Sequence, residues 1–257
     1  MSTSNPSFAE LLANPVKSPG IHNRRPVPTA VPRETVTLAD AQPPLDEYFN
    51  SLFTAFGPQH WWPAKTPFEV MIGAILTQNT SWTNVERAIA NLHTAGLLTP
   101  KGIQNASISR LEGLIRSSGY FRQKARKLKA FCEFLRKEHR GSLRKMFATP
   151  TIVLREQLLG VFGIGPETAD SILLYAGEHA VFVVDAYTKR IFSRHGWANE
   201  KTKYEDIQWM VERQSPGDTR RFNEFHALIV NTGKNYCRTQ KPLCGECPLG
   251  RYLEEGR

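Results

Sequence analysis

The chain has 257 residues, enough to bury the core of one or two domains. Its net charge of +9 and isoelectric point near 9.5 favour an anionic partner. No apolar run reaches the roughly 18 residues that a membrane-spanning helix needs, and the N-terminus lacks the layout of a secretory signal. We therefore expect a cytoplasmic protein.

Residues 1–44 contain eight of the 17 prolines and show no sustained hydrophobic period. This composition is typical of disorder, so we predict a disordered N-terminal arm over 1–44. From Leu45 onward the pattern is helical almost throughout, which predicts an all-α fold. Only residues 180–184 look extended, and this segment is too short and solitary to build a sheet.

Two consecutive segments carry apolar residues at helical spacing. The stripes consist of Phe68, Met71, Ile72, Ile75 and Leu76, followed by Val85, Ala88, Ile89 and Leu92. The polar residues 78–81 lie between them, which places Gln78 in a tight loop between helices. Further helices are predicted over residues 109–117, 122–138, 152–160, 166–177, 186–195, 202–213 and 220–232.

Ten Lys and Arg residues crowd the stretch 122–145. They indicate either an electrostatic footprint for a polyanion or a solvated helix face, and charge alone does not decide between them. Cys132 falls on the apolar stripe of this stretch, so we expect it in the core.

Residues 158–169, LLGVFGIGPETA, place two glycines around one aliphatic residue between two predicted helices. Gly163 and Gly165 permit positive φ and close approach of another backbone, and Pro166 suits the first turn of the next helix. Free amides at such a helix N-terminus bind a phosphate. An ordinary turn between helices is the alternative.

Asp185 follows the apolar residues 181–184 and precedes a predicted helix, so a plain N-cap is one reading of it. The helix 166–177 rises about 18 Å from the hairpin, and the seven residues 178–184 can retrace up to about 23 Å. Asp185 can therefore return beside the hairpin. A carboxylate there repels a nucleic-acid backbone, so its presence indicates a chemical role.

Together, the hairpin, Asp185 eighteen positions after Glu167, Gln78 in its loop and the C-terminal cysteines resemble the endonuclease III family of DNA glycosylases. The resemblance covers about residues 45–250. It implies a two-domain helix-hairpin-helix glycosylase fold with a C-terminal cysteine loop. It also implies that Asp185 is catalytic, either activating water or stabilising the cationic sugar. The DNA-binding residues that we assign are Gln78, Gly163, Ile164, Gly165 and Thr168.

Gln78 occupies the position of a family glutamine that enters the duplex when the damaged nucleotide is flipped out. A loop amide that caps a helix end is the alternative. Bifunctional family members carry a lysine two residues after the last hairpin glycine, where this chain has Glu167. A glutamate cannot form a Schiff base, so we expect a monofunctional enzyme that uses water.

The segment Trp61, Trp62, Pro63 and the more distant Trp82 resemble the branch of this family that removes 3-methyladenine. In that branch aromatic residues at the positions of Trp62 and Trp82 sandwich the flipped purine. Alkylated purines are cationic, and aromatic faces attract cations. Hydrophobic packing of the tryptophans is the alternative.

Cys237, Cys244 and Cys247 have the spacing of the family's [4Fe-4S] loop, and a reducing compartment favours metal ligation over disulfides. The family's fourth cysteine position is Leu253. The alternatives are therefore a [4Fe-4S] cluster with another fourth ligand such as Glu254, a [3Fe-4S] cluster, zinc, or an empty loop. Any such group would be structural.

The domains expected are an arm (1–44), a helical domain from 45–66 and 186–236, a central domain (67–185) with the hairpin, and the cysteine loop and tail (237–257). The expected partner is double-stranded DNA with a damaged base, bound by a nucleoid-associated monomer. The rival functions are a bifunctional glycosylase/lyase for oxidised pyrimidines, which Glu167 argues against, and a non-catalytic DNA-binding module, which Asp185 argues against.

Overall fold

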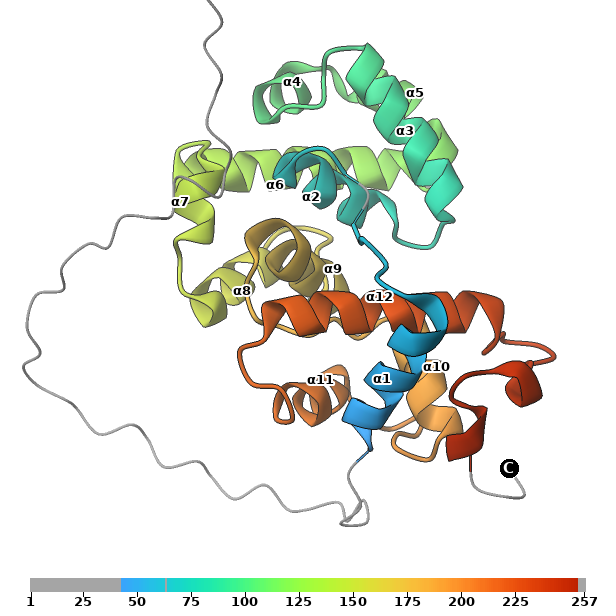
Figure 1. Cartoon of the computed structure of the whole chain (residues 1–257). Coiled ribbons are helices and arrows are strands. Elements are labelled where there is room, and N and C mark those ends of the chain that lie inside the picture. Colours follow the sequence, from blue (N-terminus) through green and yellow to red (C-terminus); the bar gives the residue numbers. More distant parts are fainter. Residues whose placement is uncertain (1–42, 63, 254–257) are drawn as a thin grey trace, which may run out of the picture. The chain divides into compact units, whose positions relative to one another are not determined.

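Helices joined by short loops make up residues 43–62 and 64–253, the part of the chain that the computed structural model describes (Figure 1). These residues belong to one structural unit, residues 40–257. Within the described ranges there is no β-strand, which confirms the all-α prediction. The α-helices are α1 (Leu45–Phe56), α2 (Pro67–Leu76), α3 (Trp82–Thr94), α4 (Pro100–Asn105), α5 (Ile108–Leu114), α6 (Phe121–His139), α7 (Leu143–Phe147), α8 (Thr151–Leu159), α9 (Pro166–Ser171), α10 (Ala186–Arg194), α11 (Tyr204–Glu212) and α12 (Thr219–Asn235).

The remaining helical segments are short. Three of them are 3-10 turns, namely η2 (Arg116–Ser118), η4 (Cys244–Glu246) and η5 (Gly250–Tyr252). The fourth, η3 (Ile172–Ala176), continues α9 as a π-helix. The predicted helix 166–177 is therefore present, but its second half is wound more loosely than an α-helix.

Side-chain oxygens cap several helices at their N-termini. Thr66 Oγ1 accepts a hydrogen bond from the Glu69 amide at 3.1 Å, just before Pro67 begins α2. The oxygen satisfies one of the amides that the first helical turn leaves without a partner, so the sequence sets where the helix begins. The same arrangement recurs at Thr99, Ser107, Ser142, Asp185 and Asp218.

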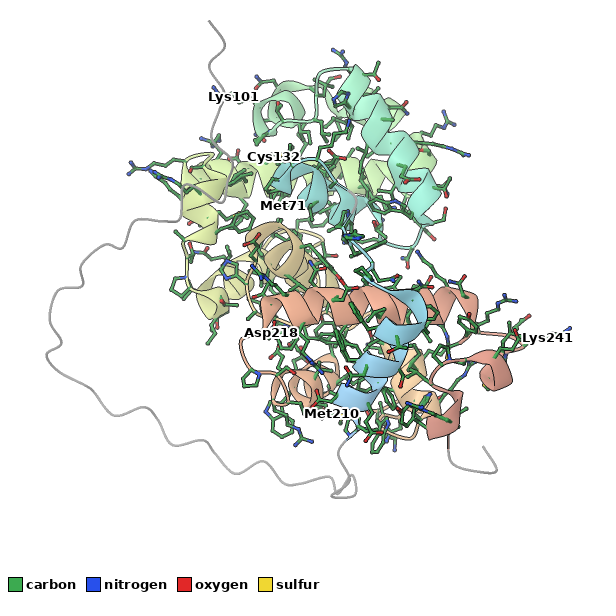
Figure 2. The ribbon with its side chains drawn as sticks, in the orientation of Figure 1. Met71, Lys101, Cys132, Met210, Asp218 and Lys241 are labelled. Atoms are coloured by element: carbon green, nitrogen blue, oxygen red, sulfur yellow. The ribbon has the colours of Figure 1, made fainter. Side chains whose placement is uncertain are left out.

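Helix α2 lies at the centre of the hydrophobic core. All its residues from Val70 to Leu76 are buried, so burial extends beyond the predicted stripe. The reason is that α2 packs against α3 and α6 and also against α9 and η3. In Figure 2, Met71 of α2 and Cys132 of α6 lie among the packed helices, whereas Lys241 projects outward. Cys132 is 2% exposed, as a core residue should be.

The basic stretch 122–145 is only partly a solvated face. Lys124 is 2% exposed and its Nζ donates to the carbonyls of Leu76 and Ser118 at 2.9 and 2.5 Å. Burial and, to a smaller extent, the charge of neighbouring Lys127 together lower the pKa of Lys124 to about 8. Lys124 therefore holds the C-terminal end of α2, next to the Gln78 loop, and is not free to bind a polyanion.

The prediction differs from the structure in two short helices, α4 and α7, which the hydrophobic period did not reveal because they have six and five residues. Residues 178–184 contain no helix and form no strand. The proposed two-domain division and its boundaries stay a prediction, and residues 1–42 of the predicted arm lie outside the described residues. Among the described residues, no helix is long and apolar enough to cross a membrane.

Candidate active site and nucleic-acid interface

The turn between α8 and α9 uses Gly163 for a left-handed backbone. Gly163 has a φ of +79°, and a Cβ there would lie 2.4 Å from Cε of Lys127. Gly165 is nearly extended, with open space where a Cβ would be, and Pro166 is the first residue of α9. Gly163 therefore gives the turn its left-handed conformation, and Gly165 leaves the backbone next to it open to solvent. An accessible backbone is what phosphate binding requires.

Gln78, in the loop between α2 and α3, is hydrogen-bonded to this turn. Its Nε2 donates to the carbonyl of Gly163 at 3.0 Å and to Oγ1 of Thr168 at 2.9 Å, and its Oε1 accepts from Nζ of Lys127. The structure therefore brings together the two predicted DNA-binding segments. In this conformation the Gln78 amide is fully engaged within the protein, so entry into a duplex would require these bonds to break.

The hairpin side chains do not all face outward. Ile164 and Thr168 are 5% and 6% exposed, which leaves their backbone as the part available to DNA. Phe162 is 61% exposed beside Gly163, and the sequence reasoning did not single it out. A large apolar residue in a glycine-rich turn was the available signal.

Asp185 is the N-cap of α10. Its Oδ1 accepts from the amide and the hydroxyl of Thr188 at 2.7 and 2.9 Å, and the residue is 9% exposed. Its Oδ2 lies 3.7 Å from Nε2 of His226, a residue that the sequence reasoning missed. Asp185 therefore does cap α10. The cap fixes Oδ1 of the carboxylate, and Oδ2 makes no bond to Thr188.

Glu167 is close enough to Asp185 for their charges to interact. Burial and, to a smaller extent, the negative charge of Asp185 together raise the pKa of Glu167 to about 7, against the opposing charge of Lys189. The Glu167 side chain is nevertheless exposed to solvent. The structure thus places Asp185 near the start of α9, where the chain-length argument put it.

The extended segment before Asp185 is held by side chains of α11 instead of a neighbouring strand. The carbonyl of Phe182 accepts from Nε2 of Gln208 at 2.7 Å, and its amide donates to Glu212 at 2.8 Å. The amide of Val184 donates to the Tyr204 hydroxyl at 3.2 Å. Buried backbone groups need such partners, so α11 sets the position of Asp185.

The predicted pocket tryptophans form a cluster. The rings of Trp62 and Trp82 meet edge to face with centroids 5.2 Å apart, and Trp61 lies 6.1 Å from Trp82. Gly73 of α2 makes room for them, because a Cβ there would lie 3.3 Å from the Trp62 ring. Pro63 lies outside the described residues.

The two rings are too close and too steeply inclined to hold a base between them. A ring inserted between two others needs them roughly parallel and about 7 Å apart, twice the usual carbon contact distance. Without a base, Trp62 and Trp82 bury their apolar surfaces against each other. The predicted sandwich is therefore not preformed, and a base would have to separate the rings.

Cys237, Cys244 and Cys247 line one small cavity together with Leu253, with a volume of about 20 Å³. Burial raises the pKa of the Cys247 thiol, and the nearby Cys237 and Cys244 raise it further. Arg194 Nη1 donates to Cys237 Sγ at 3.1 Å, which fixes the position of this sulfur on the cavity wall.

These cysteines supply three of the four ligand positions of the family's cluster loop. In residues 43–62 and 64–253, no three His, Cys, Asp or Glu side chains converge closely enough to hold one metal ion. The fourth position is the apolar Leu253, which lines the same cavity, so the residues present would hold a cluster by three thiolates. Glu254, an alternative fourth ligand, lies outside the described residues.

Comparison with known proteins shows the family to which the chain belongs. Residues 72–214 match the family model of the HhH-GPD superfamily base excision DNA repair proteins. A Methanocaldococcus jannaschii protein named as a DNA repair glycosylase is 48% identical over 206 residues, covering 79% of this chain and 93% of that protein. Endonuclease III of Thermotoga maritima is 29% identical over 210 residues, covering 82% and 92%.

Two solved structures share the fold. The 3-methyladenine DNA glycosylase (MagIII) of H. pylori, bound to 1,N6-ethenoadenine, has a TM-score of 0.65 and 29% identity, covering 74% of this chain and 97% of that one. A non-covalent endonuclease III–DNA complex has a TM-score of 0.71 and 23% identity, covering 82% and 94%. With the hairpin, Asp185 and the family match in agreement, the chain belongs to the HhH-GPD superfamily of base excision DNA repair proteins as an endonuclease III-like glycosylase.

Proposed function

We propose that the chain is a monofunctional DNA glycosylase that removes an alkylated purine, such as 3-methyladenine, by water attack. The observation that carries this proposal is the pairing of an anchored carboxylate, Asp185, with a glutamate, Glu167, at the position where bifunctional relatives carry an amine. Asp185 supplies the negative charge that base excision needs. Glu167 stands where strand cleavage would need an amine nucleophile, and its carboxylate cannot act as one.

The chemistry follows from the two oxygens of Asp185. Thr188 occupies Oδ1, so Oδ2 is the oxygen that can accept a proton from water as that water attacks C1′ of the deoxyribose. The C1′–N bond breaks and its electron pair leaves with the base. Positive charge that develops on the sugar is stabilised by the anion, which is preorganised by its cap.

The aromatic cluster supports an alkylated purine as the substrate. Such a base carries positive charge, leaves as a neutral molecule without being protonated, and is attracted to the faces of Trp62 and Trp82 once they separate. The solved H. pylori enzyme of this fold is a 3-methyladenine glycosylase, and this supports the same substrate class here.

Mass analysis of released bases tests the proposal. The protein is incubated with methylated duplex and, separately, with oxidised duplex, and strand breaks are measured before and after alkali. We expect free methylated purine and breaks only after alkali. Release of oxidised pyrimidines alone would overturn the substrate assignment.

Borohydride trapping tests the monofunctional part. Trapping requires a Schiff base between an amine and the sugar, so the unmodified protein should form no covalent adduct with DNA. Replacement Glu167→Lys restores an amine at that position and should produce some trapping. Efficient trapping by the unmodified protein would identify another amine, with Lys189 near Glu167 as the first to replace, and would make a bifunctional enzyme the better account.

A further inference from the structure

Three elements bring a half-buried tyrosine, a buried histidine and the proposed catalytic aspartate into one series of neighbouring side chains. Tyr175 belongs to η3, His226 to α12, and Asp185 caps α10. The Tyr175 hydroxyl is hydrogen-bonded to Nδ1 of His226. On the other side of the ring, Nε2 of His226 lies 3.7 Å from Oδ2 of Asp185, where the two side chains are 6% and 12% exposed.

The buried surroundings of His226 select one protonation state. Burial lowers the pKa of His226, and the opposing effect of Asp185 is smaller, so the ring is neutral near pH 7 and carries one N–H. If that hydrogen were on Nδ1, the lone pair of Nε2 would face the Asp185 carboxylate and be repelled. With Tyr175 donating to Nδ1, the hydrogen is on Nε2 and points toward Asp185.

This N–H has no hydrogen-bond partner although it is buried. The separation of 3.7 Å is longer than a hydrogen bond and too short for an intervening water. A movement of roughly half an ångström would complete a bond to Oδ2 and relieve a costly unpaired donor. Oδ2 would still keep a lone pair for the attacking water.

The far end of the series touches the aromatic cluster. The Tyr175 ring lies 5.2 Å from the Trp62 ring, inclined at 54°. A base that separates Trp62 from Trp82 therefore pushes against a residue whose hydroxyl fixes the histidine behind Asp185. The pocket and the carboxylate are joined through Tyr175 and His226, which lie 51 positions apart in the sequence.

We infer that Tyr175 and His226 are positioning residues, which orient Oδ2 of Asp185 through a hydrogen bond from Nε2 of His226 and act when a base occupies the aromatic cluster. This inference rests on the proposed glycosylase function. Thr188 fixes one oxygen of the carboxylate and His226 fixes the other. Tyr175 sets which nitrogen of His226 carries the hydrogen.

Other charged groups face the same region and stay unchanged in the test. Glu167 of α9 and Tyr187 of α10 both interact with the charge of Asp185, and Lys189 lies near Glu167. Glu224 of α12 raises the pKa of Tyr175, although burial is the larger cause. Replacements at Tyr175 and His226 leave these four charged or titratable residues in place. A change in excision rate therefore reports on the contacts from Tyr175 through His226 to Asp185.

The test measures the single-turnover excision rate and, separately, the Kd for duplex DNA containing a methylated purine. Tyr175→Phe keeps the ring against Trp62 and removes the hydroxyl. His226→Leu removes the N–H, and His226→Gln retains one. His179→Leu is the matched control, because His179 is half-buried and also has a buried, unpaired Nε2, but its Nδ1 bonds to Thr151.

Tyr175→Phe and His226→Leu should each lower the rate on the order of ten- to a hundredfold while changing Kd by less than about twofold. His226→Gln should recover part of the rate, and His179→Leu should excise at the normal rate, with thermal unfolding measured for each variant. Normal rates for both Tyr175→Phe and His226→Leu would overturn the inference. Absence of excision by the unmodified protein on every substrate would instead overturn the proposed function, so the two failures are distinct.

Discussion

Glu167 titrates close to neutral pH and therefore changes charge under ordinary conditions. Its surroundings and Asp185 raise its pKa to about 7, so the carboxylate loses its proton as the pH rises through that value. The new negative charge appears in the first turn after the hairpin, beside the expected phosphate contact. DNA affinity should then fall as the pH rises, because the two anions repel each other.

Glu167→Gln should remove this part of the pH dependence. Between about pH 6 and about pH 8, at constant ionic strength, the Kd of the unmodified protein for an undamaged duplex should rise a few-fold more than that of the variant. Fluorescence anisotropy measures both. Identical pH profiles would show that the Glu167 charge does not act on DNA.

At the scale of elements, the extended segment before Asp185 depends on α11. Gln208 Nε2 donates to the Phe182 carbonyl at 2.7 Å and to Oδ2 of Asp170 at 2.8 Å, and the buried Asp170 also forms an ion pair with the half-buried Arg155. Gln208→Leu leaves these acceptors without that donor. The free energy of unfolding should drop by about 1–3 kcal/mol in denaturant titration.

Glu205→Ala, at an exposed position of the same helix, is the control for Gln208→Leu and should change stability by less than about 0.5 kcal/mol. Equal stability of Gln208→Leu and the unmodified protein would show that α11 does not hold the segment. Reduced excision by Gln208→Leu, at a temperature where the variant remains folded, would show that the extended segment positions Asp185 for the reaction.

The sequence predicted the longer helices because each one repeats its apolar residues over two turns or more, as α2 and α6 do. It did not predict α4 or α7, which are too short to show a period. The hairpin and the Asp185 cap follow from local signals. The bonds from Gln78 to Gly163 and from Gln208 to Phe182 join positions 85 and 26 residues apart, and no local pattern encodes such pairings.

At the scale of the whole molecule, the cysteine loop joins the end of α12 to α10. Arg190 of α10 donates to the carbonyls of Cys237 and Gly233 at 2.6 and 3.0 Å, and Arg194 reaches the Cys237 thiol. A cluster held by Cys237, Cys244 and Cys247 would reinforce these contacts in a structural role. The sequence supplied the cysteines, but only the structure shows that they share one cavity.

Anaerobically purified protein should show broad absorption from iron–thiolate charge transfer and contain iron. Cys244→Ser should lose most of both signals. Cys132→Ala is the control and should keep them, because Cys132 lies in the core of α6 and burial raises the pKa of its thiol to about 12. Iron-free, colourless and fully active protein would contradict the cluster and leave the glycosylase assignment intact.

The most direct test of the central claim is the single-turnover excision rate of Asp185→Asn on methylated duplex. Asparagine is as good an N-cap as aspartate, so the variant keeps an oxygen for the Thr188 amide and the start of α10 while it removes the anion. We predict an excision rate at least about a hundredfold lower, with DNA affinity unchanged or slightly higher. Excision by Asp185→Asn at the rate of the unmodified protein would contradict it.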